Sequence, residues 1–229
     1  MANFIEHIHI TNFKSMRDLQ VAGELWMEDE NRIKRYIFRQ TESENLGGCS
    51  LDVPFGKNII NVFAYNPRVD GVKSWMKEEL SKFGLEYVLD KTGYSLKVQQ
   101  RLHGDEVFQQ PYTSIADTLQ RIIFYKTAVA SNRDSVLLFE EPEAHAFPPY
   151  IKTITQDIIG SASNQFFIAT HSPIILNDFM EYADARKEAA IYLLSFRDGQ
   201  TAIRRLPDRE VDEAYRYGED LFFNIEKFL

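Results

Sequence analysis

Two continuous apolar runs in the second half of the chain are the clearest structural pattern in the sequence. The first covers residues 135–139 (SVLLF) and the second covers residues 165–170 (QFFIAT). Runs of this length that are rich in Val, Leu, Ile and Phe predict strands buried on both faces, as in a parallel sheet. Residues 149–162 between them are long enough for the crossover helix that joins neighbouring parallel strands. We therefore expect an α/β fold with a mostly parallel sheet flanked by helices.

The rest of the chain combines helical and strand-like patterns. Apolar residues recur at helical spacing in residues 74–83 and 114–130, and Gly84 is a typical helix stop. A polar helix is expected near the C-terminus. Short apolar or alternating runs predict strands at 4–13, 58–65, 86–90, 94–101, 106–109, 190–196 and 201–206, short antiparallel strands within 21–40, and turns at 91–93 and 198–199. We expect a single domain over residues 1–229, with an antiparallel β-rich and helical portion (21–110) followed by a lobe at 111–229.

Composition narrows the class of protein without identifying it. The chain has 229 residues, 44% of them hydrophobic, and a net charge of −8, which fits a folded domain. The acidic balance argues against a chain-wide basic surface for nucleic acid, so DNA binding would need a local patch. The single cysteine, Cys49, excludes an intrachain disulfide and a cysteine-rich zinc site. No signal-peptide pattern or membrane-length apolar run is present, and the cytoplasm is the expected location.

Three carboxylates follow the first apolar run directly. Glu140, Glu141 and Glu143 flank Pro142, which has no amide hydrogen and disfavours a continued strand. In open α/β sheets, ligands bind beyond the carboxyl ends of the strands, where these acids are expected. His171 follows the second apolar run, and the crossover would bring it to the same edge. Carboxylates at such an edge suit a divalent cation and an attacking water.

Four motifs, in one order along the chain, resemble those of ABC-type ATPase heads in the SMC-like and RecF/OLD-like branch. Residues 8–15 (IHITNFKS) resemble the first strand, and residues 113–121 (TSIADTLQR) occupy the position of the signature helix. Residues 137–145 (LLFEEPEAH) are similar to the Walker B strand with its loop, and residues 169–173 (ATHSP) are similar to the switch-histidine motif. The resemblance implies an ABC-ATPase-like P-loop NTPase head.

The resemblance also implies roles for particular residues in Mg²⁺-dependent ATP hydrolysis. Glu140 would hold Mg²⁺ through water, Glu141 would orient or deprotonate the attacking water, and His171 would sense the γ-phosphate. Ser114 and Asp117 would face ATP bound to a second subunit, which implies a head-to-tail homodimer. The contexts that the family implies are DNA repair, chromosome handling and anti-phage defence, often beside a nuclease or another protein partner.

One part of the family pattern is missing from this sequence. No G-x-x-x-x-G-K-[ST] motif is present, because Gly56-Lys57 lacks both the first glycine and the final hydroxyl residue. At the place where the phosphate loop is expected, Gln20 passes directly to Val21. Either a segment near Gln20 has been deleted or omitted, or the protein is a degenerate ATPase. The intact acidic edge favours omission.

Two other functions are open on the sequence alone. A pseudo-ATPase would dimerise or scaffold a partner without turnover. A metal-dependent nuclease would instead use Glu140, Glu141, Glu143 and His145 as its metal site. The acids could also be no more than a solvated strand end.

Ser114 and His171 likewise could serve the fold alone, without any ligand. Ser114 with Asp117 three residues later resembles a capping box, in which the serine caps the helix that follows. A histidine such as His171 is often a capping or core residue.

Overall fold

The computed structural model describes residues 5–10, 19–25, 32–103, 105–182, 188–197 and 200–228, the first two stretches as backbone only. The chain divides into two compact units. The continuous unit is Asn31–Thr170, and the discontinuous unit combines Met1–Glu30 with His171–Leu229. These boundaries differ from the division near residue 110 that the sequence suggested, and the single domain over the whole chain stays a prediction.

A parallel sheet of three strands forms the centre of the continuous unit. Its order is β3 (Ile33–Tyr36), β7 (Val136–Glu140) and β8 (Gln165–Ala169), and both pairings are parallel. Strand β7 lies in the middle, and its Leu137 and Phe139 are at most 2% exposed, which explains the unbroken apolar run. The predicted α/β class is confirmed. The expectation of antiparallel strands within 21–40 was wrong for β3, because its partner is the buried strand β7.

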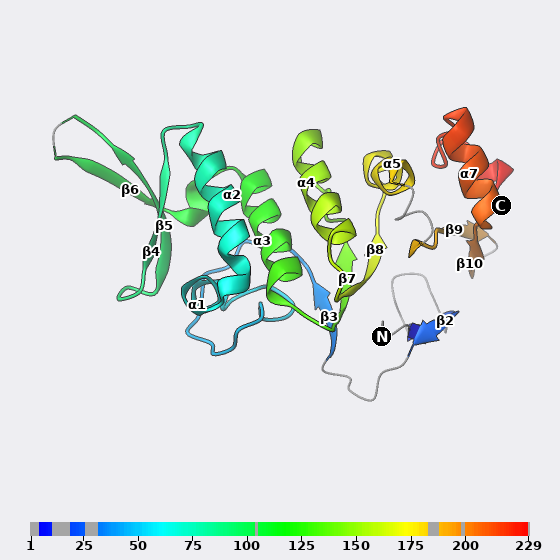
Figure 1. Cartoon of the computed structure of the whole chain (residues 1–229), viewed down its shortest axis with the longest axis horizontal. Helices are drawn as coiled ribbons and strands as arrows, with labels where there is room; N and C mark the ends of the chain where they lie inside the picture. The colour runs from blue at the N-terminus through cyan, green and yellow to red at the C-terminus, as the bar shows by residue number, and fades with distance from the viewer. Residues whose placement is uncertain are drawn as a thin grey trace. The chain divides into compact units, whose positions relative to one another are not determined.

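Three helices of the continuous unit lie side by side (Figure 1): α2 (Asp70–Ser81), α3 (Asp117–Ser131) and α4 (Pro148–Ile159). The helix α3 contacts the sheet through Tyr125, whose ring meets that of Phe139 edge to face with centroids 5.0 Å apart. Such a pair adds about 0.5–1.5 kcal/mol beyond the burial of its rings. The helix α4 connects β7 to β8 and is the crossover that the sequence predicted.

The segment at 58–65 is a helix, α1 (Ile59–Tyr65), and the prediction of a strand there was wrong. Its β-branched and aromatic residues favour a strand, but tertiary contacts override that preference. The side chains of three asparagines donate hydrogen bonds to carbonyls of the preceding loop: Asn58 to Ser50, Asn61 to Leu46 and Asn66 to Cys49. One 3₁₀ turn, η2 (Pro67–Val69), then leads from α1 into α2.

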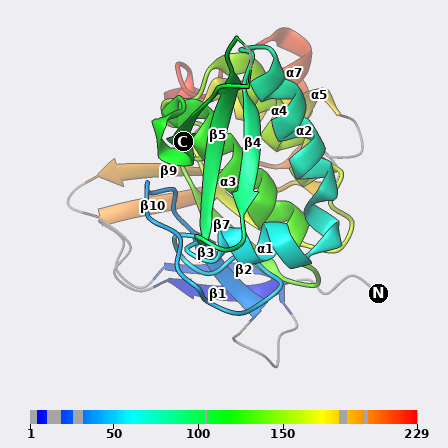
Figure 2. The ribbon, with the colours of Figure 1, turned by 90° about the vertical axis from the view of Figure 1, so that its left-hand side faces the viewer.

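A second sheet of the continuous unit is antiparallel, in the order β4 (Glu86–Asp90), β5 (Ser95–Arg101), β6 (Val107–Pro111). All three strands were predicted. Gly84 has a φ of +69°, a left-handed conformation suited to glycine, and it separates α2 from β4. Leu96 is 6% exposed, so one face of the sheet is packed. Figure 2 shows the β4–β5 hairpin in front of α3 and beside α2.

In its described residues, the discontinuous unit contains two pairs of antiparallel strands and two helices. Its strand pairs are β1 (Ile5–Ile10) with β2 (Leu19–Leu25), and β9 (Tyr192–Arg197) with β10 (Gln200–Arg205). Its helical elements are α5 (Pro173–Glu181), α7 (Asp208–Tyr217) and the 3₁₀ turn η4 (Ile225–Lys227). Six residues form its buried apolar cluster: Met180, Leu193, Leu206, Val211, Ala214 and Leu221.

Most predictions for the discontinuous unit are confirmed. The strands expected at 4–13, 190–196 and 201–206 are present, as is the helix near the C-terminus. The expected turn at 198–199 lies outside the described residues. Among the helices in the described part of the chain, none combines the length and apolar character that a membrane span requires.

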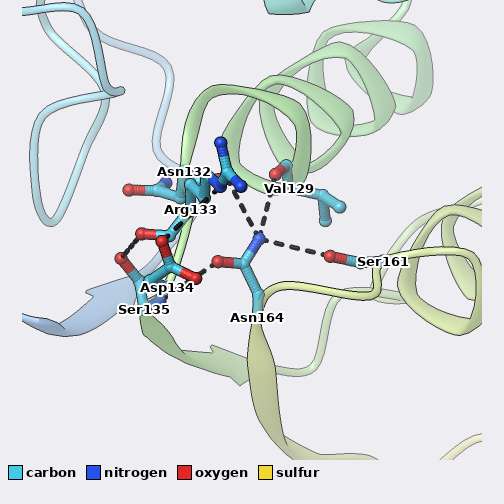
Figure 3. Close-up of polar contacts among 7 residues, drawn as sticks. All are labelled: Val129, Asn132, Arg133, Asp134, Ser135, Ser161 and Asn164. Carbon is cyan, nitrogen blue, oxygen red and sulfur yellow. Dashed lines mark hydrogen bonds and ion pairs between the residues drawn. The ribbon is translucent and has the colours of Figure 1, made fainter. Parts of the chain in front are cut away.

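One side chain, Asn164, holds together the amino ends of β7 and β8 (Figure 3). Its Oδ1 accepts a hydrogen bond from the Ser135 amide at 3.2 Å, just before β7. Its Nδ2 donates to the Asn132 carbonyl after α3 and to the Ser161 hydroxyl after α4, both at 3.2 Å. The two strands and two helices are therefore fixed to one another at the end opposite the acidic residues.

Candidate functional site

The predicted acidic residues lie at the carboxyl edge of the parallel sheet. Glu140 is the last residue of β7 and stands in register with Ala169, the last residue of β8. The amide of Glu141 donates to the Ala169 carbonyl at 2.8 Å, which continues the strand pairing one residue past β7. The sheet therefore fixes the backbone on which these carboxylates are carried.

The acidic turn, residues 140–146, folds back on itself directly after the strand. The Ala144 amide donates to the Glu141 carbonyl at 3.0 Å, and the Ala146 amide donates to the Glu143 carbonyl at 2.8 Å. Glu141 has a φ of +45° and His145 a φ of +58°, both in the left-handed region. For residues other than glycine this conformation costs about 1–2 kcal/mol. Such backbone strain persists where the surroundings fix it, often at functional sites.

Two neighbouring elements hold the acidic turn in place. Glu143 Oε1 accepts a hydrogen bond from Thr170 Oγ1 at 2.7 Å, which ties the turn to the residue after β8. Thr118 Oγ1, in the first turn of α3, donates to the His145 carbonyl at 2.7 Å. The Glu143 side chain and the His145 backbone therefore have structural roles in this turn, whereas the sequence suggested these residues either as metal ligands of a nuclease or as residues without a ligand.

Glu140 forms an ion pair with a residue that sequence reasoning missed. The Arg35 guanidinium, on the neighbouring strand β3, donates to Glu140 Oε2 at 2.7 Å. The Glu140 side chain is 21% exposed and that of Arg35 is 48% exposed. The signal that would have found Arg35 is its register opposite Leu138, two residues before Glu140, but this requires knowing that β3 is parallel to β7.

Tyr125 of α3 lies beneath the same edge. Its hydroxyl donates to the Glu140 carbonyl at 3.3 Å. Burial raises the pKa of Tyr125 to about 12, against the opposing effect of Arg121. The phenol is therefore neutral near pH 7 and can only support the strand end as a hydrogen-bond donor.

The structure corrects the expected start of the signature helix. Ser114 belongs to a 3₁₀ turn, η3 (Tyr112–Ser114), and its hydroxyl donates to the Pro111 carbonyl at 2.6 Å. The helix α3 begins at Asp117 after Ala116, without a side-chain cap, so the capping box was wrong. The Ser114 hydroxyl is bonded within the 3₁₀ turn and does not cap α3. Its role toward ATP, like that of Asp117, stays a prediction.

His171 belongs to the discontinuous unit, whereas Glu140 and Glu141 belong to the continuous unit. It follows Thr170 directly in the chain, and Thr170 is bonded to Glu143. Its part in a site shared with Glu141 stays a prediction.

The acidic turn can supply oxygen ligands but is not a metal cage. Within the described ranges, no group of three or more His, Cys, Asp or Glu side chains is arranged to hold a metal ion. The four residues that a nuclease would use therefore do not form such a group. A nucleotide-bound Mg²⁺ needs only one or two carboxylates besides phosphates and water, and Glu140 fits that requirement.

The phosphate side of the expected site is absent from this sequence. Strand β2 runs through Gln20 and Val21 without interruption, and both residues pair with β1. A phosphate loop inserted between them would have to break a paired strand.

A surface groove of about 670 Å³ opens at the other end of the parallel strands. Its lining includes Arg133 and Asn164, which precede β7 and β8, and the ion pair of Lys126 with Asp157 at 2.6 Å. The groove is thus at the amino ends of the strands, away from the acidic turn, and takes no part in the candidate site.

No protein-family model matches the chain, and no curated protein matches it. The solved structures to which it is similar include SMC heads. One is a structure from work on the structural biochemistry of ATP-driven dimerization and DNA-stimulated activation of SMC ATPases. It is 17% identical to this chain with a TM-score of 0.43, and the match covers 69% of this chain and 96% of that chain. An Smc head bound to the C-winged helix domain of ScpA is 17% identical, with a TM-score of 0.43, over 66% of this chain and 50% of that chain.

A third similar structure is an Smc head domain with an extended coiled coil bound to the C-terminal domain of ScpA, derived from Pyrococcus furiosus. It is 16% identical, with a TM-score of 0.43, over 70% of this chain and 40% of that chain. The chain therefore spans nearly all of the first of these structures and half or less of the other two. All three likenesses are distant.

Proposed function

We propose that this chain is an ATPase head of the ABC type, in which the acidic turn supplies the metal and water side of the nucleotide site. The observation that supports this most directly is the anchoring of the turn at the carboxyl edge of β7 and β8. The Glu141 amide bonds to Ala169, and the Glu143 carboxylate bonds to Thr170. A carboxylate on such a fixed backbone can hold an attacking water in one position, which lowers the entropy cost of the reaction.

The residues of this chain would divide the work in the proposed site. Glu140 would hold Mg²⁺ through water, and the bound ion would neutralise charge on the phosphates. Glu141 would orient the attacking water and accept its proton. His171 would contact the γ-phosphate, and Ser114 with Asp117 would face nucleotide on a second copy. The active form in this proposal is a head-to-tail homodimer that serves DNA repair, chromosome handling or anti-phage defence.

A second candidate function is a head that dimerises or scaffolds a partner without hydrolysing ATP. Two observations favour it. The sequence has no phosphate loop, and β2 is continuous where the loop is expected. In addition, the Arg35 guanidinium already compensates the charge of Glu140, the carboxylate that Mg²⁺ would need.

The Glu141→Gln variant tests the enzyme proposal. We expect it to keep MgATP binding and to lose ATP turnover by about 10²-fold or more, because glutamine cannot accept the proton. Binding is measured by titration calorimetry and turnover by phosphate release. Glu78→Gln, which changes an exposed carboxylate of the same unit, is the matched control and should leave both unchanged.

The two candidates predict different results for the unaltered chain. Unchanged turnover in Glu141→Gln would refute the role of Glu141. Absence of MgATP binding by a chain verified to be full length would reject the enzyme and favour the scaffold. Sequencing the gene around codon 20 shows independently whether a phosphate loop has been omitted there.

A further inference from the structure

Strand β6 is an open edge of the antiparallel sheet. The sheet ends at β6, and all five of its residues are exposed, with Val107 at 45% and Phe108 at 52%. The β5–β6 ribbon extends away from the helices in Figure 1. Edge strands are usually protected from pairing by charges or by proline. Strand β6 (VFQQP) has no charged residue, and its one proline, Pro111, is at its end.

The pairing with β5 shows which backbone groups of β6 point outward. The Leu102 amide donates to the Glu106 carbonyl at 3.0 Å, so these opposed residues form a hydrogen-bonded pair. Such pairs alternate along an antiparallel ladder, which makes Gln100 and Phe108 the next one. The amides of Val107 and Gln109 therefore point away from β5. In the described part of the chain they make no hydrogen bond.

Pro111 agrees with this assignment. It stands opposite Lys97 on β5 and lies two residues after Gln109. The backbone groups of Pro111 therefore point to the open side, like those of Gln109. A proline at this position loses no bond to β5, because the missing N–H would have pointed to the open side. Its carbonyl accepts from Ser114 and has a second lone pair available.

The side chains on one face of the sheet form a chain of hydrogen bonds that ends at the open edge. Gln109 Nε2 donates to Gln99 Oε1 at 3.0 Å, and Gln99 Nε2 donates to Glu86 Oε2 at 2.9 Å. The Gln109 amide group retains a second N–H and its own Oε1. Its remaining donor and acceptor suit another glutamine placed opposite it.

We propose that β6 pairs with β6 of a second copy of this chain, antiparallel and with Gln109 at the two-fold axis. Each Gln109 amide would donate to the Gln109 carbonyl of the other copy. Each Val107 amide would donate to the Pro111 carbonyl of the other copy. Because proline has no backbone N–H, Pro111 itself leaves no donor without a partner. The two sheets of three strands would join into one sheet of six.

A second copy is favoured over a different protein because the edge is self-complementary. Gln109 offers the same donor and acceptor to itself, and the absence of charge in β6 removes like-charge repulsion across the axis. This contact uses neither nucleotide nor the acidic turn, so it is independent of the proposed ATPase function.

Light scattering after size exclusion, in the absence of nucleotide, tests the proposal. The unaltered chain should shift from monomer to dimer as its concentration rises. Gln109→Lys and Gln109→Glu should each weaken the dimer by about fivefold, because each places like charges opposite one another at the axis. An equimolar mixture of the two variants should restore dimerisation, since lysine then faces glutamate.

The matched controls are Gln110→Lys and Gln110→Glu, on the opposite face of the same strand. In the proposed register Gln110 faces Phe108 of the other copy, so mixing these two variants should not strengthen the dimer. Thermal unfolding of each variant checks that the sheet is retained. A chain that stays monomeric at every concentration overturns the proposal, as does a dimer of folded Gln109 variants that the mixture fails to strengthen.

Discussion

Arg35 forms an ion pair with Glu140, the proposed metal ligand. A guanidinium at 2.7 Å holds the Glu140 carboxylate where a hydrated cation would otherwise interact with it. Half-exposed pairs of this kind contribute only about 0.2–1 kcal/mol to folding. The pair is therefore weak enough for Mg²⁺ and phosphates to displace it, but it competes with them.

The Arg35→Gln variant separates these two effects. We expect a change in the free energy of unfolding of less than about 1 kcal/mol. We also expect tighter binding of Mn²⁺, as a probe for Mg²⁺, because the carboxylate loses its competing cation. Urea denaturation measures the first quantity and titration calorimetry the second.

Arg101→Gln provides the control for this experiment, because it removes another arginine that is paired with a glutamate, Glu86, at 3.5 Å. It should not alter Mn²⁺ binding. Weaker Mn²⁺ binding in Arg35→Gln would show that Arg35 supports the metal site instead of competing with the ion.

At the scale of elements, the local sequence pattern was sufficient to predict a helix or a strand where burial alone determines the structure. The apolar run of β7 and the helical spacing of α3 were both recognised from the sequence. The local pattern failed at α1, where Asn58 and Asn66 stabilise a helix through hydrogen bonds to carbonyls of the preceding loop, which the periodicity of the segment does not reveal. The local pattern also failed at Ser114. A capping pattern in the sequence does not show that the Ser114 hydroxyl donates a hydrogen bond to the preceding Pro111 carbonyl instead of capping the helix.

The candidate site follows the same division. The position of Glu140 and Glu141 after a buried strand was predictable, because an apolar run followed by acids and proline is typical of a strand that ends at a sheet edge. The Glu140–Arg35 pair depends on which strands are neighbours, and the Glu143–Thr170 bond depends on the geometry of a strained turn. Neither relation is local in the sequence.

Asn164 joins elements of the continuous unit through its hydrogen bonds, and the loss of these bonds should lower stability measurably. We expect Asn164→Ala to lower the free energy of unfolding by about 1–3 kcal/mol, because the Ser135 amide and the Asn132 carbonyl lose their partner. Urea denaturation monitored by circular dichroism measures this. Ser163→Ala, an exposed neighbour, should change stability by less than about 0.5 kcal/mol. Equal losses in both variants would contradict the role of Asn164.

At the scale of the whole molecule, the continuous unit has the elements of an independent domain. The parallel sheet, the helices α1 to α4 and the antiparallel sheet all lie within Asn31–Thr170. A chain segment of this size with its own buried core generally folds alone.

We therefore expect a fragment of residues 31–170 to unfold cooperatively in urea, with coincident transitions by fluorescence and circular dichroism. A shorter fragment, 31–134, lacks β7 and β8 and should show no cooperative transition. A gradual, non-cooperative transition of the longer fragment would mean that its core requires the rest of the chain.

The nested arrangement of the two units has a consequence for biosynthesis. A ribosome completes all of residues 31–170 before it reaches His171, so the continuous unit can fold while translation is still under way. Residues 1–30 are made before the continuous unit, yet the remainder of their own unit, 171–229, is made after it. Residues 1–30 must therefore wait until the whole continuous unit has been made before the rest of their own unit is available, and in that interval chaperones have access to them.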